Sequence, residues 1–103
     1  VHAMRRVTVH DHGQVAVIEV DGDLDTITGH DLRRTLATVL RTTTGLINLD
    51  LSRVRLVDED GIDTLTWCSQ SAISAGRRLM WSGCSQPLAE RLRATAGFRS
   101  SPR

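Results

Sequence analysis

An apolar strand between two helical segments is the feature that most restricts how this chain can fold. Residues 46–51 are apolar at four of six positions, which predicts a strand in the middle of a sheet. Upstream, Leu32, Leu36, Val39 and Leu40 recur at helical spacing and form one apolar stripe. Downstream, a second helix is predicted from about residue 60 to residue 75. This alternation predicts an α/β fold.

The segments before the first helix predict a hairpin and a loop. Val7 and Val9 alternate with polar residues, and residues 14–20 follow a turn-like His12-Gly13, so two paired strands are expected. Residues 21–25 are predicted to be a loop. Thr28 and Asp31 resemble a capping box at the start of the first helix.

The C-terminal part predicts one more strand and one more helix. Residues 79–81 form a short strand, Ser85 caps the last helix with Pro87 in its first turn, and Gly97 ends it. At 103 residues the chain has room for one domain, residues 1–103, whose core is expected at about 5–98. We therefore predict a mixed sheet of four to five strands with about three helices packed on it.

Composition and charge argue against several classes of protein. The longest apolar run is residues 15–18, far short of the ~20 residues of a membrane helix, and no signal-peptide stretch is visible. We expect a cytoplasmic protein without membrane insertion. Residues 21–63 carry nine acids and five arginines, whereas residues 64–103 carry six arginines and one acid. Such a dipolar surface suits the steering of a charged protein partner, and with only Phe98 near the basic end we expect no nucleic acid.

The sequence shows no metal site or catalytic motif. Asp21, Asp23 and Asp25 alternate like the opening of a calcium loop, but the Gly and Glu that such a loop needs are missing. His10 and His12 have no third ligand nearby and are better interpreted as an exposed strand end. Neither a nucleophile elbow nor a phosphate-binding loop is present. We expect no metal, no cofactor and no enzymatic activity.

Three consecutive carboxylates follow the central strand at the start of the second helix. The free N–H groups and positive dipole end there stabilise each acid by roughly 0.3–1 kcal/mol. Because three neighbouring acids also repel one another, their density exceeds what a helix start requires. Together with nearby residues they are the candidate partner-binding surface, made of Asp23, Asp25, Asp58, Glu59, Asp60, Gly61, Asp63 and Trp67.

The second helix has an expected inner face and an unusual outer one. At 100° per residue, one side is predicted to pack on the sheet, and Trp67 falls roughly opposite, beside Asp63. Trp67 is then either an exposed anchor for a protein partner or packed under the last helix or the C-terminus. The predicted sheet-facing side consists of Ile62, Leu65, Ser69, Ala72, Ile73 and Gly76.

Cys68 and Cys84 are the two cysteines of the chain. They are too few for a disulfide framework, and two buried reduced thiols are the simpler interpretation. A redox pair is the alternative, since a bridge would close a loop of about sixteen residues.

In order along the chain, four short motifs resemble those of the STAS domain, the fold of bacterial anti-sigma factor antagonists. The resemblance covers roughly residues 5–98. The motifs are Gly22-Asp23-Leu24-Asp25, Leu49-Asp50-Leu51-Ser52, Val57-Asp58-x-x-Gly61-Ile62, and the spacing from Ala75-Gly76 to the strand that ends at Gly83.

The resemblance implies a partner that is both anti-sigma factor and serine kinase, and that phosphorylates a Ser of the family motif. Here Glu59 occupies the phospho-acceptor position and Asp60 replaces the next Ser. Neither can accept phosphate as a Ser does, although together they approximate the charge of a phosphoserine. We therefore expect an antagonist-like module that is not regulated by phosphorylation at this position.

Two other functional hypotheses remain open. One is a STAS scaffold in another assembly, such as the small cytoplasmic subunit of a lipid-type ABC transporter. The other is a nucleotide-binding or enzymatic STAS domain, against which the missing general base and glycine-rich cradle argue. Whether the chain acts as an antagonist or as a scaffold, we expect a monomer or a weak dimer.

Overall fold

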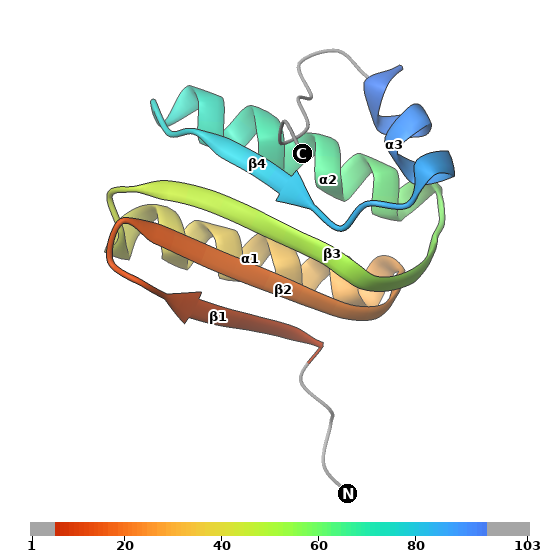
Figure 1. Ribbon diagram of the computed structural model, residues 1–103, viewed down its shortest axis with the longest axis horizontal. Coiled ribbons are helices and arrows are strands. Elements are labelled where there is room, and N and C mark those ends of the chain that lie inside the picture. The colour runs from red at the N-terminus through yellow and green to blue at the C-terminus, as the bar shows by residue number, and fades with distance from the viewer. Residues whose placement is uncertain (1–5, 95–103) are drawn as a thin grey trace, which may run out of the picture.

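The computed structural model describes residues 6–94, in which seven elements follow the predicted order. This order confirms the α/β fold class (Figure 1). Residue 5, the end of the last helix at Gly97 and the rest of the predicted core beyond residue 94 lie outside the described residues. The elements are β1 (Val7–Asp11), β2 (Val15–Leu24), α1 (Thr26–Thr42), β3 (Leu46–Val57), α2 (Glu59–Ser74), β4 (Leu79–Ser82) and α3 (Gln86–Arg93).

The described strands form one mixed sheet in the order β1-β2-β3-β4. β1 and β2 make the predicted antiparallel hairpin, whereas β2, β3 and β4 pair in parallel. Each parallel strand is followed by a helix, so the carboxyl ends of these strands and the first turns of α1, α2 and α3 lie at one edge of the sheet (Figure 1). That edge is where the candidate site lies.

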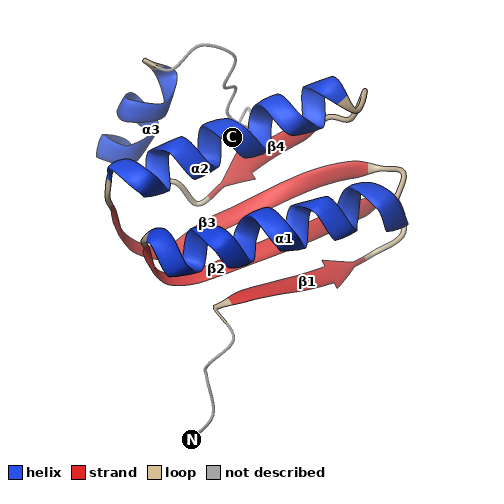
Figure 2. Ribbon diagram, turned by 180° about the vertical axis from the view of Figure 1, so that it is seen from behind, coloured by secondary structure: helices blue, strands red, loops and turns tan. Residues whose placement is uncertain are grey.

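The core lies between the sheet and the two long helices, α1 and α2, which cover one face of it (Figure 2). Alternate residues of β2 and β3 point to this face, as expected for strands with one buried side. Trp81 of β4 is only 2% exposed and fills the core beside β3. The fully buried side chains include Ile18, Val20, Leu32, Leu36, Ile47, Leu49, Leu51 and Leu65.

The loop predicted at residues 21–25 is wrong, because β2 continues as a strand to Leu24. Gly22 and Leu24 are buried while Asp21 is exposed, so the alternation of the strand persists through the acidic residues. Two register shifts in the pairing with β3 accommodate this extension, and Gly22 has a φ of 97° there.

The capping box predicted at Thr28 is also wrong. α1 begins two residues earlier, and its N-cap is Asp25, whose Oδ1 accepts the Thr28 N–H at 2.9 Å. This hydrogen bond from the Thr28 backbone lowers the pKa of the Asp25 carboxyl. Thr28 is instead the third residue of the helix, and its side chain is buried in the first turn.

The predicted inner face of α2 is correct in its centre and wrong at its edges. Leu65, Ser69 and Ala72 are buried, but Ile73 is 61% exposed, Gly76 is exposed and Ile62 is half-buried. The inner face instead includes Gly61, Thr64 and Cys68. The cause is a close approach of α2 to α1, where a Cβ on Gly29 would lie 2.7 Å from the Thr64 Oγ1 atom. α2 therefore packs against α1 as well as the sheet.

Candidate functional site

The three consecutive acids at the start of α2, here called the acidic corner (Asp58, Glu59 and Asp60), each interact with a different element. Asp58 is the N-cap of α2, and its Oδ1 accepts the Gly61 N–H at 2.8 Å. The Asp60 Oδ2 accepts a hydrogen bond of 2.7 Å from the Thr26 hydroxyl at the start of α1. The Glu59 Oε2 lies 3.6 Å from Nη2 of Arg91 on α3. Separate partners explain how the chain tolerates three neighbouring charges.

Two contacts hold the acidic corner in place. Arg91 donates from Nη1 to the Val57 carbonyl at 3.0 Å, which ties α3 to the end of β3. Gly61 is buried, and a Cβ there would lie 2.5 Å from the Leu24 carbonyl oxygen and 2.7 Å from Cγ1 of Val57. Only glycine allows α2 to begin directly against the ends of β2 and β3.

Exposed apolar side chains flank the acidic corner on both sides. Ile27 in the first turn of α1 is 76% exposed, and Leu56 near the end of β3 is 68% exposed. Ile27 follows the Thr26 that binds Asp60, and Leu56 lies two residues before Asp58. Apolar anchors beside charged groups are typical of protein-binding surfaces. Neither residue was predicted from the sequence, although apolar residues next to an acidic cluster are a visible signal there.

Trp67 lies on the outer side of α2 and is half-buried. The Arg33 guanidinium of α1 stacks over the indole, 5.3 Å from its centroid, and donates weakly to the Thr64 hydroxyl at 3.4 Å. Among the described residues, the group that covers part of Trp67 therefore comes from α1 rather than from α3, and the predicted cover by the C-terminus lies outside the described residues.

The sequence matches the family described as "Mlab, STAS domain" over residues 7–97. The chain belongs to the STAS domain family. No curated protein matches the sequence. No described helix is long and apolar enough to cross a membrane.

Solved structures share the fold of this STAS domain. The anti-sigma factor antagonist SpoIIAA in its unphosphorylated form is 14% identical, with a TM-score of 0.73 over 92% of this chain and 88% of that one. An RsbS variant from Moorella thermoacetica, in which a serine is replaced by glutamate, is 18% identical, with a TM-score of 0.76 over 96% and 88%. A sulfate transporter family protein from Wolinella succinogenes is 26% identical, with a TM-score of 0.68 over 79% and 66%. The predicted STAS fold is thereby confirmed.

The remaining predicted binding residues of the STAS domain are split between two surfaces. Asp25 lies at the same sheet edge as the acidic corner, and Asp63 lines a hollow of about 270 Å³ between α1 and α2 together with Asp60. Asp23 is instead on the sheet face away from the helices, where its Oδ1 lies 3.9 Å from Nε of Arg55. The structure therefore does not bring Asp23 to the acidic corner.

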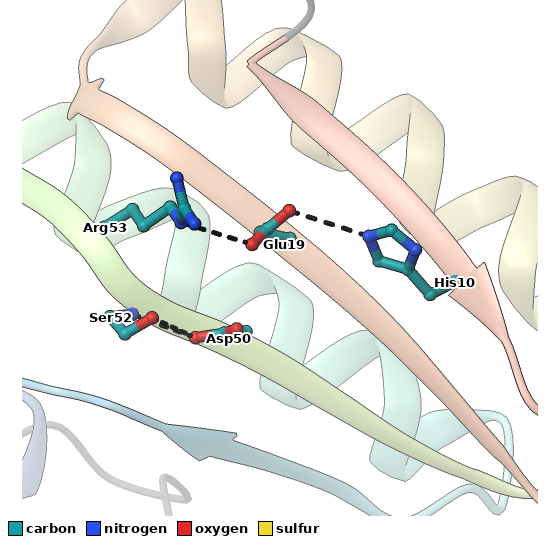
Figure 3. A network of polar contacts seen from close by, with 5 residues as sticks. All are labelled: His10, Glu19, Asp50, Ser52 and Arg53. Atoms are coloured by element: carbon teal, nitrogen blue, oxygen red, sulfur yellow. Dashed lines mark hydrogen bonds and ion pairs between the residues drawn. The ribbon is translucent and has the colours of Figure 1, made fainter.

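The sheet face without helices carries polar side chains that bind one another (Figure 3). Glu19 lies between His10 and Arg53, with both nitrogen–oxygen distances at 3.5 Å. The Ser52 hydroxyl donates to the Asp50 Oδ1 at 2.7 Å. These polar groups are therefore paired with one another on the face itself.

Cys68 and Cys84 are free thiols in the structure. Burial raises the pKa of the Cys68 thiol to about 12 and also raises that of Cys84. Since the thiolate is the reactive form, neither side chain has the environment of a redox-active cysteine. The redox pair remains a prediction without structural support.

Proposed function

We propose that this STAS domain is a non-catalytic regulatory module that binds an anti-sigma factor or a related serine-kinase-like protein through the acidic corner. The observation that carries the proposal is the joint position of three acids and two exposed apolar residues, Ile27 and Leu56, at the edge where all three helices begin. All three carboxylates are exposed, and their contacts within the chain hold them in place at this edge.

Position 59 determines how such a module is regulated. A serine at this position gains about −1.5 to −2 charges on phosphorylation, whereas Glu59 carries its charge permanently. The Glu59 carboxylate is 93% exposed and has Arg91 beside it. We therefore propose that binding is set by the abundance of the protein rather than by a phosphorylation cycle at residue 59.

The test is affinity capture from lysate of the source organism with tagged wild type, Glu59→Ser and Leu56→Ser, followed by identification of bound proteins. Recovery of an anti-sigma kinase by the wild type supports the proposal, and Leu56→Ser should reduce that recovery several-fold. Val9→Ser is the matched control, since Val9 is 41% exposed on β1, away from the acidic corner. An equal effect of both substitutions would contradict the assignment of the surface.

The Glu59→Ser variant also tests the regulatory part of the proposal. Incubated with the captured kinase and ATP, it should incorporate phosphate, whereas the wild type should not. A folded Glu59→Ser protein that binds the kinase and stays unmodified would show that more than residue 59 has changed.

A second candidate is a STAS subunit of a membrane transport assembly. The family description names Mlab, and the sulfate transporter family protein from Wolinella succinogenes is 26% identical. In this case the same capture experiment would recover transporter subunits. The Glu59→Ser substitution would not lead to binding or phosphorylation by a kinase.

A further inference from the structure

β3 is much longer than β4, the strand that pairs with its outer side. β4 pairs only with residues 47–50 of β3, whereas β3 continues to Val57. After Ser82 the chain leaves the sheet for α3, so the end of β3 extends past the tip of β4 (Figure 1). In the described part of the chain, residues 53–57 therefore pair with β2 on one side and with no strand on the other. Such an open edge presents backbone groups to which a further extended segment can bind.

A hollow of about 190 Å³ lies between the end of β3 and the first part of α3. Its apolar lining comes from Val54, Leu56 and Val57 of β3 and from Pro87 and Leu88 of α3. Leu56 is 68% exposed, so the hollow opens to solvent beside an apolar side chain. Strand addition at a sheet edge commonly combines backbone hydrogen bonds with a pocket for a side chain of the added segment. The open edge and the hollow together offer both.

The charges at the hollow indicate what kind of segment fits it. Both ionisable residues of its lining, Arg55 and Arg91, are arginines. Arg55 has one carboxylate nearby, Asp23, at a long distance of 3.9 Å, and its side chain is 76% exposed. Because an exposed pair of this length contributes little to stability, Arg55 can bind a carboxylate that a partner supplies. The hollow is therefore complementary to an acidic segment.

The same charges argue against two other occupants of the open edge. If two copies of the chain paired through residues 53–57, Arg53 and Arg55 of one copy would lie close to those of the other, and like charges on paired strands are destabilising. Residues 95–103 of the chain itself include two arginines and no acidic residue. Neither a second copy nor this C-terminal segment complements the arginines of the hollow.

We propose that an extended, acidic segment of a protein partner adds to the open edge of β3, with one apolar side chain in the hollow and a carboxylate at Arg55. The inference does not rest on the proposed function, because it requires neither the acidic corner nor a kinase. Register shifts interrupt the pairing of this part of β3 with β2, so the added strand is short. A short segment that must be ordered on binding is expected to have a dissociation constant between about 0.1 and 2 mM.

A nuclear magnetic resonance titration of the full chain tests the proposal, with acetyl-Glu-Val-Glu-Val-Glu-Val-Glu-amide added up to about 5 mM as the probe. The backbone amide signals of residues 53–57 and of the first turn of α3 should shift together and approach saturation. The same peptide with lysine in place of every glutamate should bind at least about fivefold more weakly, because the arginines repel it. A peptide with proline at its central position should also bind more weakly, because proline lacks the N–H group that a strand donates.

Two variants locate the site on the protein. Arg55→Glu reverses the charge at the hollow, and Pro87→Glu adds an acid to it, so each should weaken binding of the acidic peptide at least about fivefold. Pro87→Glu keeps the test valid if Arg55→Glu does not fold, because glutamate is favourable in the first turn of a helix. Arg34→Glu is the matched control, since Arg34 is 84% exposed on α1 and its replacement changes the net charge as Arg55→Glu does. This control should bind the peptide like the wild type.

Three results would overturn the proposal. One is a wild type whose amide signals at residues 53–57 do not move at about 5 mM of the acidic peptide. Another is equal binding of the acidic and the lysine peptide. The third is a set of shifts centred on β1, the other edge of the described sheet, because the peptide would then pair with any exposed strand rather than with this hollow.

Discussion

Gly61 lies where the acidic corner meets the core, and the structure requires a residue without a side chain at this position. A Cβ would lie 2.5 Å from the Leu24 carbonyl oxygen, closer than real Cβ contacts allow. In an exposed helix, replacing Gly by Ala stabilises by about 1 kcal/mol. We predict that Gly61→Ala instead destabilises the protein by about 1–3 kcal/mol, because the backbone of β2 must shift.

Urea unfolding measures this effect, with Ser74→Ala as a control at an exposed position of the same helix. The control should change the free energy of unfolding by less than about 0.5 kcal/mol. If Gly61→Ala were as stable as the wild type, the close contact between α2 and β2 would not be a constraint.

The two thiols differ in burial, and we predict that they differ in reactivity. Cys68 is buried with a pKa of about 12, whereas Cys84 is half-buried with a pKa that burial raises. In the folded protein at pH 8, a maleimide should therefore modify Cys84 and leave Cys68 untouched until the chain unfolds. Mass spectrometry of peptides from the labelled protein identifies the modified site, and early labelling of Cys68 would contradict its burial.

The Cys68 thiol also predicts a loss of stability in alkali. Its pKa is raised on folding from 9.0 to about 12, so the stabilising difference is fully present below pH 9 and is lost as the pH rises toward 12. Over this range the free energy of unfolding falls by at most about 1.4 kcal/mol per pH unit because of this thiol. Between these pH values, thermal unfolding should show that Cys68→Ala loses stability less steeply with pH than the wild type does. Equal pH dependence of the two proteins would contradict the raised pKa.

Among the elements, the C-terminal end of α1 is held by one side chain. Arg77, just after α2, donates to the Thr43 carbonyl at 2.8 Å, the Gly45 carbonyl at 2.7 Å and the Leu40 carbonyl at 3.3 Å. These bonds join the end of α1 and the start of β3 to the segment before β4. The guanidinium thus satisfies carbonyls that a helix end leaves without partners.

We predict that Arg77→Met lowers the free energy of unfolding by about 2–4 kcal/mol, because several charged hydrogen bonds are lost together. Arg77→Lys should recover only part of this loss, since an ammonium group cannot reach the same acceptors in a fork. Urea unfolding provides the measurement and Arg78→Met, at the neighbouring exposed position, the control. If Arg77→Met and Arg78→Met lowered the free energy of unfolding equally, the hydrogen bonds of Arg77 would not be the cause.

At the level of elements, the sequence predicted what depends on local periodicity. The order of strands and helices was correct because apolar residues repeat clearly, as Leu32 and Leu36 do in α1. The extension of β2 to Leu24 was missed because aspartates alternating with Gly22 resemble a turn, and only pairing with β3 keeps them extended. The shifted inner face of α2 depends on the contact between Gly29 and Thr64, which are far apart in the chain.

The candidate site was predictable only where it is local in sequence. Three neighbouring carboxylates marked the start of α2, but the partners that separate their roles, Thr26 and Arg91, come from the start of α1 and the last turn of α3. Asp23 was predicted to belong to the site, whereas strand alternation turns it to the sheet face away from the helices.

On the scale of the whole molecule, the elements share one core, and we predict that the described chain unfolds as a single unit. The radius of gyration is 12.6 Å, as expected for a single domain of this length. Trp81 in β4 packs in the same buried cluster as Ile18 of β2 and Leu36 of α1. Loss of any one layer would expose the others, so partial unfolding that spares part of the core is unfavourable.

Urea unfolding of Trp67→Phe, followed by fluorescence and by far-UV circular dichroism, tests this cooperativity. In this variant the fluorescence reports Trp81 in β4, while the dichroism reports mainly the two long helices α1 and α2. Both should give the same midpoint, with a free energy of unfolding of roughly 5–10 kcal/mol. An earlier fluorescence change would mean that β4 detaches before the helices unfold. The sheet edge that carries α3 and Arg91 would then be a separate, less stable unit, and the acidic corner would lose its contact with α3 first.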